Sequence, residues 1–329
     1  MKKNIFISGG AGYIGSHCVI SLVKNGYNPI ILDNFSNSNK SVIKSLQNIL
    51  GIKIKYYDVD LKDKKKLRSI FKKHSCFSVI HCAGFKSVDQ SINKPISYFD
   101  NNIGSTLSLL ECMEERGVFK LIFSSSANLY NEDQPMPLKE TAKIGNTRNP
   151  YGNSKYITER ILIDLAKHDS RWRISIARYF NPIGSHASGL LQEFTEDIPS
   201  NLMPYLVKVA QKKLPYLKVF GKNYNTKDGT CLRDYIHVTD LANGHIALLK
   251  NNRSKKNLNI YNFGTGKGSS VLEVIKTFEK QNKISIPYRF TKRRKGDAAV
   301  SYCDPKKALK ELNWKAKFNL NQAIKNILK

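Results

Sequence analysis

A glycine-rich turn close to the N-terminus constrains the fold of this chain more than any other stretch. An apolar run at residues 5–7 leads into Ser8-Gly9-Gly10-Ala11-Gly12-Tyr13-Ile14-Gly15, and an amphipathic segment follows at residues 18–25. This order predicts a strand, a tight turn and a helix. Glycines let the backbone bend sharply and approach a pyrophosphate, which binds the free N–H groups and the positive dipole end of the helix. The stretch therefore predicts a dinucleotide-binding turn.

An acidic residue at the end of the next predicted strand supports this interpretation. The apolar run at residues 29–33 ends in Asp33, at about the distance from the glycines that the dinucleotide fingerprint requires. A carboxylate there binds the adenosine ribose hydroxyls and repels the extra phosphate of NADP, so Asp33 favours NAD. The glycines alone would also suit a turn that binds no ligand. The strand, the helix and the acidic residue together favour the cofactor.

Strand-like and helix-like segments alternate through the first half of the chain. This alternation predicts an α/β fold with a Rossmann-like, doubly wound parallel sheet covered on both faces. Beyond about residue 181, Pro and Gly become frequent and the elements become shorter. We expect an NAD-binding domain at residues 1–180, with returning segments near 235–265, and a smaller, interleaved α/β domain at 181–329. The expected strands are residues 5–8, 29–33, 52–59, 77–82, 120–124 and 173–179, and the expected helices include 41–50, 62–74, 97–116 and 151–168.

Composition excludes several classes of protein. No apolar run among the 329 residues approaches the ~20 residues of a membrane span, and the N-terminal apolar run breaks at Ser8, unlike a signal peptide. Six scattered cysteines without a CxxC pair predict a reduced, cytoplasmic protein and no metal site. The net charge of +28 comes from lysines spread along the chain rather than clustered, so we expect no nucleic-acid partner.

Tyr151 and Lys155 form the second notable feature. Positions four apart share one face of a helix, so the two side chains would project together. An ammonium beside a phenol stabilises the phenolate and lowers its pKa from ~10, as a bound nicotinamide cation also would. The pair follows the serine-rich strand end Ser124-Ser125-Ser126. We therefore expect Tyr151 to act as a base near neutral pH.

These residues resemble the UDP-glucose 4-epimerase (UDP-galactose 4-epimerase) family of the extended short-chain dehydrogenase/reductases. The resemblance covers nearly the whole chain, and its most specific motifs are Asn201-Leu202-Met203-Pro204-Tyr205 and Arg233-Asp234-Tyr235-Ile236-His237. The remaining motifs lie at residues 9–17, 32–34, 83–86, 98–102, 123–127, 150–155, 178–182, 261–262 and 293–297.

The resemblance implies an isomerase that uses tightly bound NAD. Tyr151 would take the proton from the sugar 4-hydroxyl while a hydride leaves C4 for NAD+. Ser126 would hydrogen-bond the same oxygen, and Lys155 would bind the nicotinamide ribose and tune Tyr151. The 4-keto sugar would then turn in the pocket and take the hydride back on its other face. The implied substrate is thus a UDP-sugar. The implied assembly is a homodimer that forms through the helices at 97–116 and 151–168.

The resemblance also implies two sets of binding residues. The cofactor set comprises Gly9, Gly12, Tyr13, Ile14, Gly15, Asp33, Asn34, Phe35, Ser36, Asn37, Ser38, Asp60, Leu61, Cys82, Ala83, Gly84, Phe85, Lys86, Asn101, Ser126, Tyr151, Lys155, Tyr179 and Phe180. The substrate set comprises Lys86, Ser126, Tyr151, Asn181, Asn201, Leu202, Lys218, Val219, Phe220, Arg233, Tyr235, Arg294, Asp297 and Ser301. The guanidinium groups of Arg233 and Arg294 suit a pyrophosphate because their forks pair with phosphate oxygens.

The chain departs from the family pattern in four places. Asn128 replaces a threonine, Asn131 follows Tyr130 where glycine is usual, Gly104-Ser105 replaces Asn-Gly, and the loop at residues 190–197 matches poorly. None of these departures removes a group that hydride transfer requires.

Ser301 falls at a family position that faces the sugar. A small residue there is associated with room for a 2-N-acetyl group, so we expect UDP-N-acetylglucosamine and UDP-N-acetylgalactosamine to be substrates as well. An alignment shifted by one residue would place Val300 or Tyr302 at this wall instead.

Two alternative functions stay open at this point. A nucleotide-sugar dehydratase, decarboxylase or reductase would share the fold, but a dehydratase needs carboxylates where this chain has Ala127-Asn128, and a net oxidoreductase would release its cofactor. A non-catalytic NAD-sensing or nucleic-acid-binding protein would not need Ser126, Tyr151 and Lys155 together.

Overall fold

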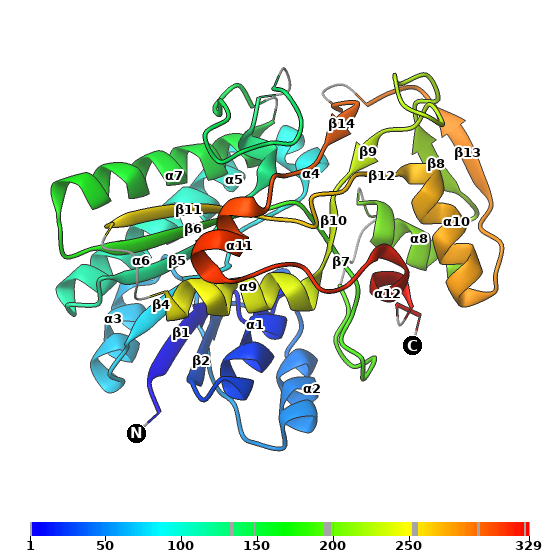
Figure 1. The fold of residues 1–329 in the computed structure, drawn as a ribbon. Coiled ribbons are helices and arrows are strands. Elements are labelled where there is room, and N and C mark those ends of the chain that lie inside the picture. Colours follow the sequence, from blue (N-terminus) through cyan, green and yellow to red (C-terminus); the bar gives the residue numbers. More distant parts are fainter. Residues whose placement is uncertain are drawn as a thin grey trace.

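A seven-stranded parallel sheet forms the centre of the larger lobe (Figure 1). The computed structural model describes residues 2–131, 134–147, 149–193, 199, 201–251, 256–294, 297–325 and 327–328. The strand order is β11-β6-β5-β4-β1-β2-β3, so the chain starts near the middle and winds outward in both directions. The strands are β1 (Asn4–Ser8), β2 (Asn28–Asp33), β3 (Lys55–Asp58), β4 (Ser78–His81), β5 (Lys120–Ser124), β6 (Arg173–Tyr179) and β11 (Leu258–Phe263).

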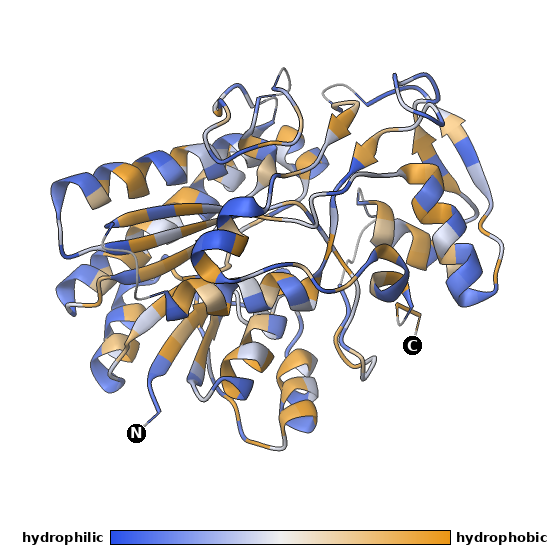
Figure 2. Ribbon diagram, viewed as in Figure 1, coloured by the Kyte–Doolittle hydropathy of each residue, from blue (hydrophilic) through white to orange (hydrophobic). Residues whose placement is uncertain are grey.

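This sheet confirms the predicted fold class. The inner strands are continuous apolar runs because helices cover both of their faces, as Figure 2 shows by their hydrophobic colouring. β3 is shorter than the predicted run at 52–59. It lies at the edge of the sheet, where its side chains are largely exposed and only Lys55–Asp58 pairs with β2.

Two layers of helices cover the sheet. One apolar cluster joins it to α1 (Tyr13–Lys24), α2 (Ser41–Leu50) and α9 (Val238–Lys250), and another joins it to α3 (Lys64–Lys73), α6 (Ser105–Glu115) and α7 (Pro150–His168). The helix α9 and the strand β11 return to this lobe from the second half of the chain.

The predicted helix at 97–116 is divided into pieces. It consists of α5 (Pro95–Phe99), the π-helical turn η1 (Asp100–Gly104) and α6, and α4 (Val88–Asn93) precedes it. The hydroxyl of Thr106 donates to the carbonyl of Asn102 at 2.7 Å, within the turn where the helix widens. Wide turns of this kind often occur at functional sites.

The smaller lobe has its own apolar core around Met203, Leu206, Val274 and Phe278. It contains α8 (Leu202–Ala210), α10 (Val271–Asn282), α12 (Leu320–Ile324) and the parallel pair β8 (Leu217–Phe220) and β13 (Tyr288–Thr291). The remaining elements are β7 (Asn181–Ile183) paired with β10 (Tyr235–His237), β9 (Leu232–Arg233) between β12 (Ser269–Ser270) and β14 (Val300–Ser301), η2 (Ala127–Leu129) and α11 (Lys306–Leu312).

The hydroxyl of Tyr13 joins the two halves of the chain next to the glycine-rich turn by donating to the carbonyl of Gly184 at 2.6 Å. The indole N–H of Trp314 donates to the carbonyl of Asp240 on α9 at 3.1 Å and so ties the C-terminal segment to this helix. Within the described ranges, every helix is too short or too polar to cross a bilayer.

Candidate active site

A cavity of about 560 Å³ opens at the carboxyl ends of the central strands, bounded on one side by the smaller lobe. A second hollow of about 100 Å³ shares part of this lining and lies at the carboxyl ends of β2 and β3. The main cavity collects the predicted residues Gly9, Gly12, Tyr13, Ile14, Gly15, Asn37, Ser38, Cys82, Gly84, Phe85, Lys86, Ser126, Tyr151, Lys155, Tyr179, Phe180, Asn181, Asn201, Arg233 and Ser301. The smaller hollow adds Asp33, Asn34, Ser36, Asp60, Leu61, Ala83 and Asn101.

The glycine-rich turn is packed so tightly that only glycine fits. A Cβ on Gly15 would lie 2.0 Å from the carbonyl oxygen of Gly9, and one on Gly9, where φ is +68°, would lie 2.6 Å from the nitrogen of Ala83. The helix α1 follows at Tyr13, and its N-cap Gly12 offers no side-chain cap. The N–H groups of its first turn therefore point into the cavity as donors for a phosphate. These features fit the pyrophosphate of a dinucleotide.

Asp33 organises the loop beside the smaller hollow. Its carboxylate accepts hydrogen bonds from the N–H groups of Ala11 and Phe35, both at 2.9 Å, and from the hydroxyl of Ser38 at 3.1 Å. Burial raises the pKa of this carboxyl, and the three hydrogen bonds oppose that rise. The Phe35 ring turns away and packs edge-on against Tyr56. Asp33 thus presents a carboxylate where the ribose of NAD would lie.

Tyr151, Ser126 and Lys155 converge on the floor of the main cavity. Asn149 caps α7 by accepting a hydrogen bond from the N–H of Gly152 at 2.8 Å, which fixes the first turn that carries Tyr151. The hydroxyl of Ser126 lies beside the phenol of Tyr151 and acts to lower its pKa. The ammonium of Lys155 donates to the carbonyl of Ser124 at 2.9 Å.

The pKa of Tyr151 differs from the prediction. Burial raises it above its ordinary value, and the hydroxyl of Ser126 opposes that rise. Burial lowers the pKa of Lys155 itself to about 8. The net shift of the Tyr151 pKa in this structure is therefore upward, opposite to the predicted lowering.

Asn102 fixes the loop that borders the cavity. Its side-chain amide donates to the carbonyl of Phe85 at 3.1 Å and to the hydroxyl of Ser154 at 2.9 Å, and its oxygen accepts from the N–H of Phe85 at 2.8 Å. Sequence reasoning selected the neighbouring Asn101 and missed Asn102. The available signal was a pair of asparagines inside an otherwise amphipathic helical stretch.

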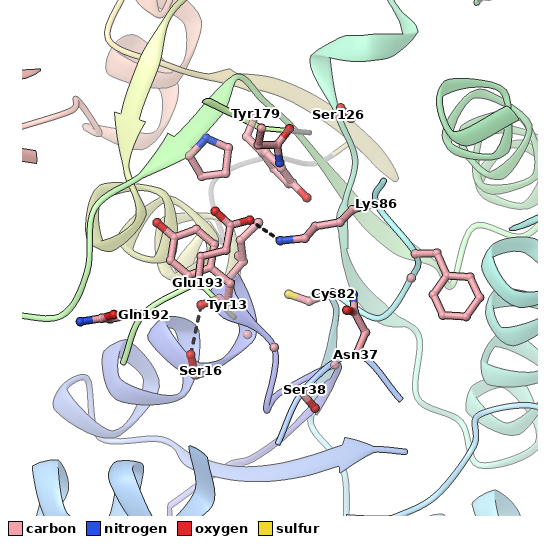
Figure 3. A pocket seen from close by; sticks show the side chains of 18 of the residues that line it. Tyr13, Ser16, Asn37, Ser38, Cys82, Lys86, Ser126, Tyr179, Gln192 and Glu193 are labelled. Carbon is pink, nitrogen blue, oxygen red and sulfur yellow. Dashed lines mark hydrogen bonds and ion pairs between the residues drawn. The ribbon is translucent and has the colours of Figure 1, made fainter. Parts of the chain in front are cut away.

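An ion pair between Lys86 and Glu193 crosses the cavity (Figure 3). Lys86 comes from the loop after β4, and Glu193 from the loop that follows β7. Sequence reasoning missed Glu193 because it lies in the poorly matched loop at 190–197, of which residues 194–197 fall outside the described ranges. A carboxylate facing a predicted cofactor-binding lysine became visible only in three dimensions.

The substrate residues divide into two groups. Asn181, Asn201, Arg233 and Ser301 line the main cavity with Lys86, Ser126 and Tyr151. Ser301 lines it whereas Val300 and Tyr302, both described, do not, which favours the unshifted alignment. The remaining predicted residues, all described, lie outside this lining: Leu202, Lys218, Val219, Phe220, Tyr235, Arg294 and Asp297.

Several of these outer residues gather near Arg233. Its guanidinium lies 3.5 Å from the Asp297 carboxylate, and the guanidinium of Arg294 lies 3.9 Å from the centre of the Phe220 ring. Val219 is buried in the apolar core of the smaller lobe, so only its backbone could contact a ligand.

The described departures from the family pattern leave the floor of the cavity intact. Asn128 lines the cavity, and its backbone N–H donates to the hydroxyl of Ser126 at 3.2 Å. Asn131 lies farther out and accepts from the N–H of Asn146 at 3.0 Å. Gly104 and Ser105 lie where η1 passes into α6.

Comparison with known proteins agrees with this geometry. The model of the NAD dependent epimerase/dehydratase family matches residues 5–264. The chain belongs to this family. Its NAD dependence agrees with the cofactor predicted from the glycine-rich turn and Asp33.

Three relatives resemble the chain over almost its whole length. A UDP-glucose 4-epimerase of Pasteurella multocida is 47% identical over 98% of this chain and 95% of that protein. A crystal structure of UDP-glucose-4-epimerase from Stenotrophomonas maltophila, with bound NAD and formylated UDP-arabinopyranose, is 41% identical with a TM-score of 0.96, covering 99% of this chain and 97% of the other. A structure of the Bifidobacterium longum enzyme with NAD+ and UDP is 45% identical with a TM-score of 0.95, at the same coverage.

Proposed function

We propose that this protein interconverts UDP-glucose and UDP-galactose by inverting the sugar at C4 with tightly bound NAD. The observation that carries the proposal is the convergence of Ser126, Tyr151 and Lys155 in one cavity that runs from the glycine-rich turn to Arg233. The relatives that carry the name UDP-glucose 4-epimerase support it through their identity and coverage.

The residues of the larger lobe suit the cofactor. The turn at residues 9–15 would hold its pyrophosphate, residues 33–38 with Asp60 and Leu61 its adenosine, and residues 82–86 with Asn101, Tyr179 and Phe180 its nicotinamide half. When bound, NAD+ accepts the C4 hydrogen with its electron pair and returns it, and its positive charge favours the phenolate of Tyr151.

The protein residues handle the proton. The phenolate oxygen of Tyr151 takes the proton of the sugar 4-hydroxyl and, after the 4-keto sugar has turned in the cavity, returns it to the same oxygen. The configuration inverts because the hydride comes back to the opposite face of C4. Ser126 hydrogen-bonds the sugar oxygen and Tyr151, so it holds the two atoms at a distance suited to proton transfer. Lys155, held by the carbonyl of Ser124, adds a positive charge beside the reacting groups.

The smaller lobe, residues 181–329 apart from the segments that return to the sheet, would bind the UDP. Arg233 and Arg294 would pair with its pyrophosphate, and Asp297 orients the guanidinium of Arg233. The uridine and sugar would contact the other predicted residues: Asn181, Asn201, Leu202, Lys218, Val219, Phe220, Tyr235 and Ser301.

We extend the proposal to assembly, location and substrate range. Two copies would associate through the surface of α5, α6 and α7. The six free cysteines favour a reducing compartment, so we place the protein in the cytoplasm. Ser301, at the cavity wall, leaves room for a 2-N-acetyl group, so N-acetylated UDP-sugars would also be substrates.

One experiment tests the function directly. Purified protein is incubated with UDP-galactose without added NAD, the products are identified, and the bound cofactor is released and quantified. We expect UDP-glucose and close to one NAD per active chain. No interconversion, or net formation of NADH, would contradict the proposal, and a 4-keto-6-deoxy sugar would favour a dehydratase. Asn128, rather than a carboxylate, lines the cavity where a dehydratase needs its acid.

A further inference from the structure

Three side chains suited to binding a soft metal ion lie together beneath the cofactor cavity. Cys18 on α1, Cys82 after β4 and His245 on α9 offer ligand atoms that all lie within 4.8 Å of one another. Cys18 and His245 are fully buried, whereas Cys82 lines the cavity (Figure 3). We propose that these residues bind a single thiophilic metal ion, represented by Zn²⁺, and that the bound ion inhibits the proposed reaction.

The imidazole of His245 already has the orientation of a metal ligand. Its Nδ1 lies 2.9 Å from the carbonyl oxygen of Leu241, which can only accept, so Nδ1 carries the proton. The unprotonated Nε2 then faces the cluster, 2.7 Å from Oγ of Ser124. Histidine ligands usually donate their second ring N–H to a carbonyl or carboxylate, which fixes the tautomer. The carbonyl of Leu241 fills that role.

The hydroxyl of Ser124 lies where a fourth metal ligand could bind. Its Oγ lies 3.2 Å from Sγ of Cys82 as well as 2.7 Å from Nε2 of His245. Two thiolates, an imidazole and one oxygen form a tetrahedral set that Zn²⁺ accepts. Given the metal–ligand bond lengths of zinc, the most distant ligand atoms need to approach by only about 1 Å. Ser124 or a water from the cavity side would complete the set.

The scaffold and the local charge both favour such a site. The ligands come from α1, α9 and the end of a central strand, and the two helices pack against each other on one face of the sheet. Regular elements hold ligands more precisely than loops do. Two thiolates also cancel the charge of a divalent ion, so binding adds no net charge next to the Lys155 ammonium.

Occupation of this site would disturb the reacting groups. The carbonyl of Ser124 holds the Lys155 ammonium at 2.9 Å, so an ion that draws in the Ser124 hydroxyl also moves the acceptor of Lys155. Cys82 would be drawn away from the cavity wall at the same time. The inhibition rests on the proposed function, whereas the metal binding does not.

A search for CxxC pairs cannot detect this cluster. Spacing rules detect ligands that are close in sequence, and Cys18, Cys82 and His245 are far apart along the chain. The proposed site therefore departs from the expectation of no metal, which rested on the spacing of the cysteines.

Metal titration tests the binding. Reduced protein is treated with a chelator, titrated with Zn²⁺ or Co²⁺ and desalted. We expect one retained ion per chain, and for cobalt an absorption band of thiolate-to-metal charge transfer. Cys18→Ala and Cys82→Ala should each weaken binding more than about 100-fold. Cys76→Ala, which removes a thiol outside the cluster, should bind like the wild type. No retained ion, or equal binding by all variants, would overturn the proposal.

A second measurement does not depend on the folding of variants. In the wild-type protein, Zn²⁺ should protect Cys82 from alkylation by iodoacetamide and leave the rate at Cys76 unchanged. Zn²⁺ should also suppress turnover of UDP-galactose, and a chelator should restore it. Equal alkylation of Cys82 with and without Zn²⁺ would contradict the site, and full turnover at full occupancy would contradict the inhibition. A protein without turnover that still binds Zn²⁺ would refute the proposed function alone.

Discussion

The proposed chemistry depends most directly on the phenol of Tyr151. Tyr151→Phe removes the proton acceptor but keeps the ring that fills this buried position. We expect kcat to fall by about 10²–10⁴-fold, the usual range for losing a general base, with the bound NAD retained. Steady-state assays with UDP-galactose and quantification of the released cofactor check both points.

Tyr156→Phe is the matched control for this substitution. Tyr156 lies on the same helix, where it packs against Gly145 and away from the main cavity. Its variant should keep wild-type turnover. Near wild-type turnover of Tyr151→Phe would remove Tyr151 from the mechanism.

A substitution at Ser301 tests the substrate range. Ser301→Tyr places a bulky ring at the cavity wall, where the 2-N-acetyl group would lie. We expect turnover of UDP-N-acetylgalactosamine to fall at least tenfold, because the ring occupies that space, while turnover of UDP-galactose by the same variant changes little. Comparing kcat/KM for the two sugars gives the answer. Equal losses for both sugars would show that Ser301 does not face the 2-position.

The helix α7 is tied to the sheet by a buried ion pair between Glu159 and Arg178. The guanidinium of Arg178 donates to the carboxylate at 2.6 and 3.1 Å, and also to the hydroxyl of Tyr130 at 3.1 Å. Both charged side chains are almost inaccessible. Because α7 also carries Tyr151 and Lys155, this pair holds the helix with the proposed catalytic residues against β6.

Glu159→Gln should therefore destabilise the protein strongly. It leaves the guanidinium buried without a counter-charge, which costs about 3–5 kcal/mol of unfolding free energy. Glu115→Gln breaks the bidentate pair with Arg68, which is exposed to solvent, and should destabilise the protein far less because water screens the two charges. Urea unfolding of both variants measures the contrast. Equal losses would show that burial does not set the strength of the α7 pair.

At the level of elements, the sequence predicted most of the central sheet and its covering helices. The strands β5 and β6 begin and end at the predicted residues 120–124 and 173–179. The centre of β5, residues 121–123, is continuously apolar, as buried parallel strands usually are. The prediction of one continuous helix at 97–116 was wrong in detail. The stretch contains the π-helical turn at Asp100–Gly104, where the Asn102 side chain hydrogen-bonds Phe85 and Ser154. Such contacts leave no periodic pattern in the sequence.

At the level of the whole molecule, sequence reasoning found the parts of the cavity but not their partners. The glycine-rich turn, Ser126 and Tyr151 were recognisable from local motifs. Glu193, which faces Lys86, and His245, which lies beneath Cys82, come from distant segments that only the fold brings near. Sequence motifs identify residues that are close together in the sequence. Contacts between residues of distant segments depend on how the whole chain packs.

Buried histidines spread over both halves of the chain make stability sensitive to acid. Burial lowers the pKa of His17, His237 and His245 to about 4 and that of His81 to about 3. In the unfolded chain these groups titrate near 6.5. Between these values the unfolded state binds more protons, so the unfolding free energy rises with pH and is lost as pH falls below 6.5. Each histidine contributes a slope of up to about 1.4 kcal/mol per pH unit.

His17→Asn isolates one of these contributions. Nδ1 of His17 lies 2.8 Å from the carbonyl of Tyr13, and the amide N–H of asparagine can donate there without binding a proton. Between pH 6.5 and 5, above the range in which Asp and Glu ordinarily titrate, the slope of unfolding free energy against pH should fall by about 1 kcal/mol per pH unit on average. His168→Asn, on the exposed end of α7, should keep the wild-type slope. Urea unfolding across this range measures all three proteins, and a flat wild-type profile would contradict the burial of neutral histidines.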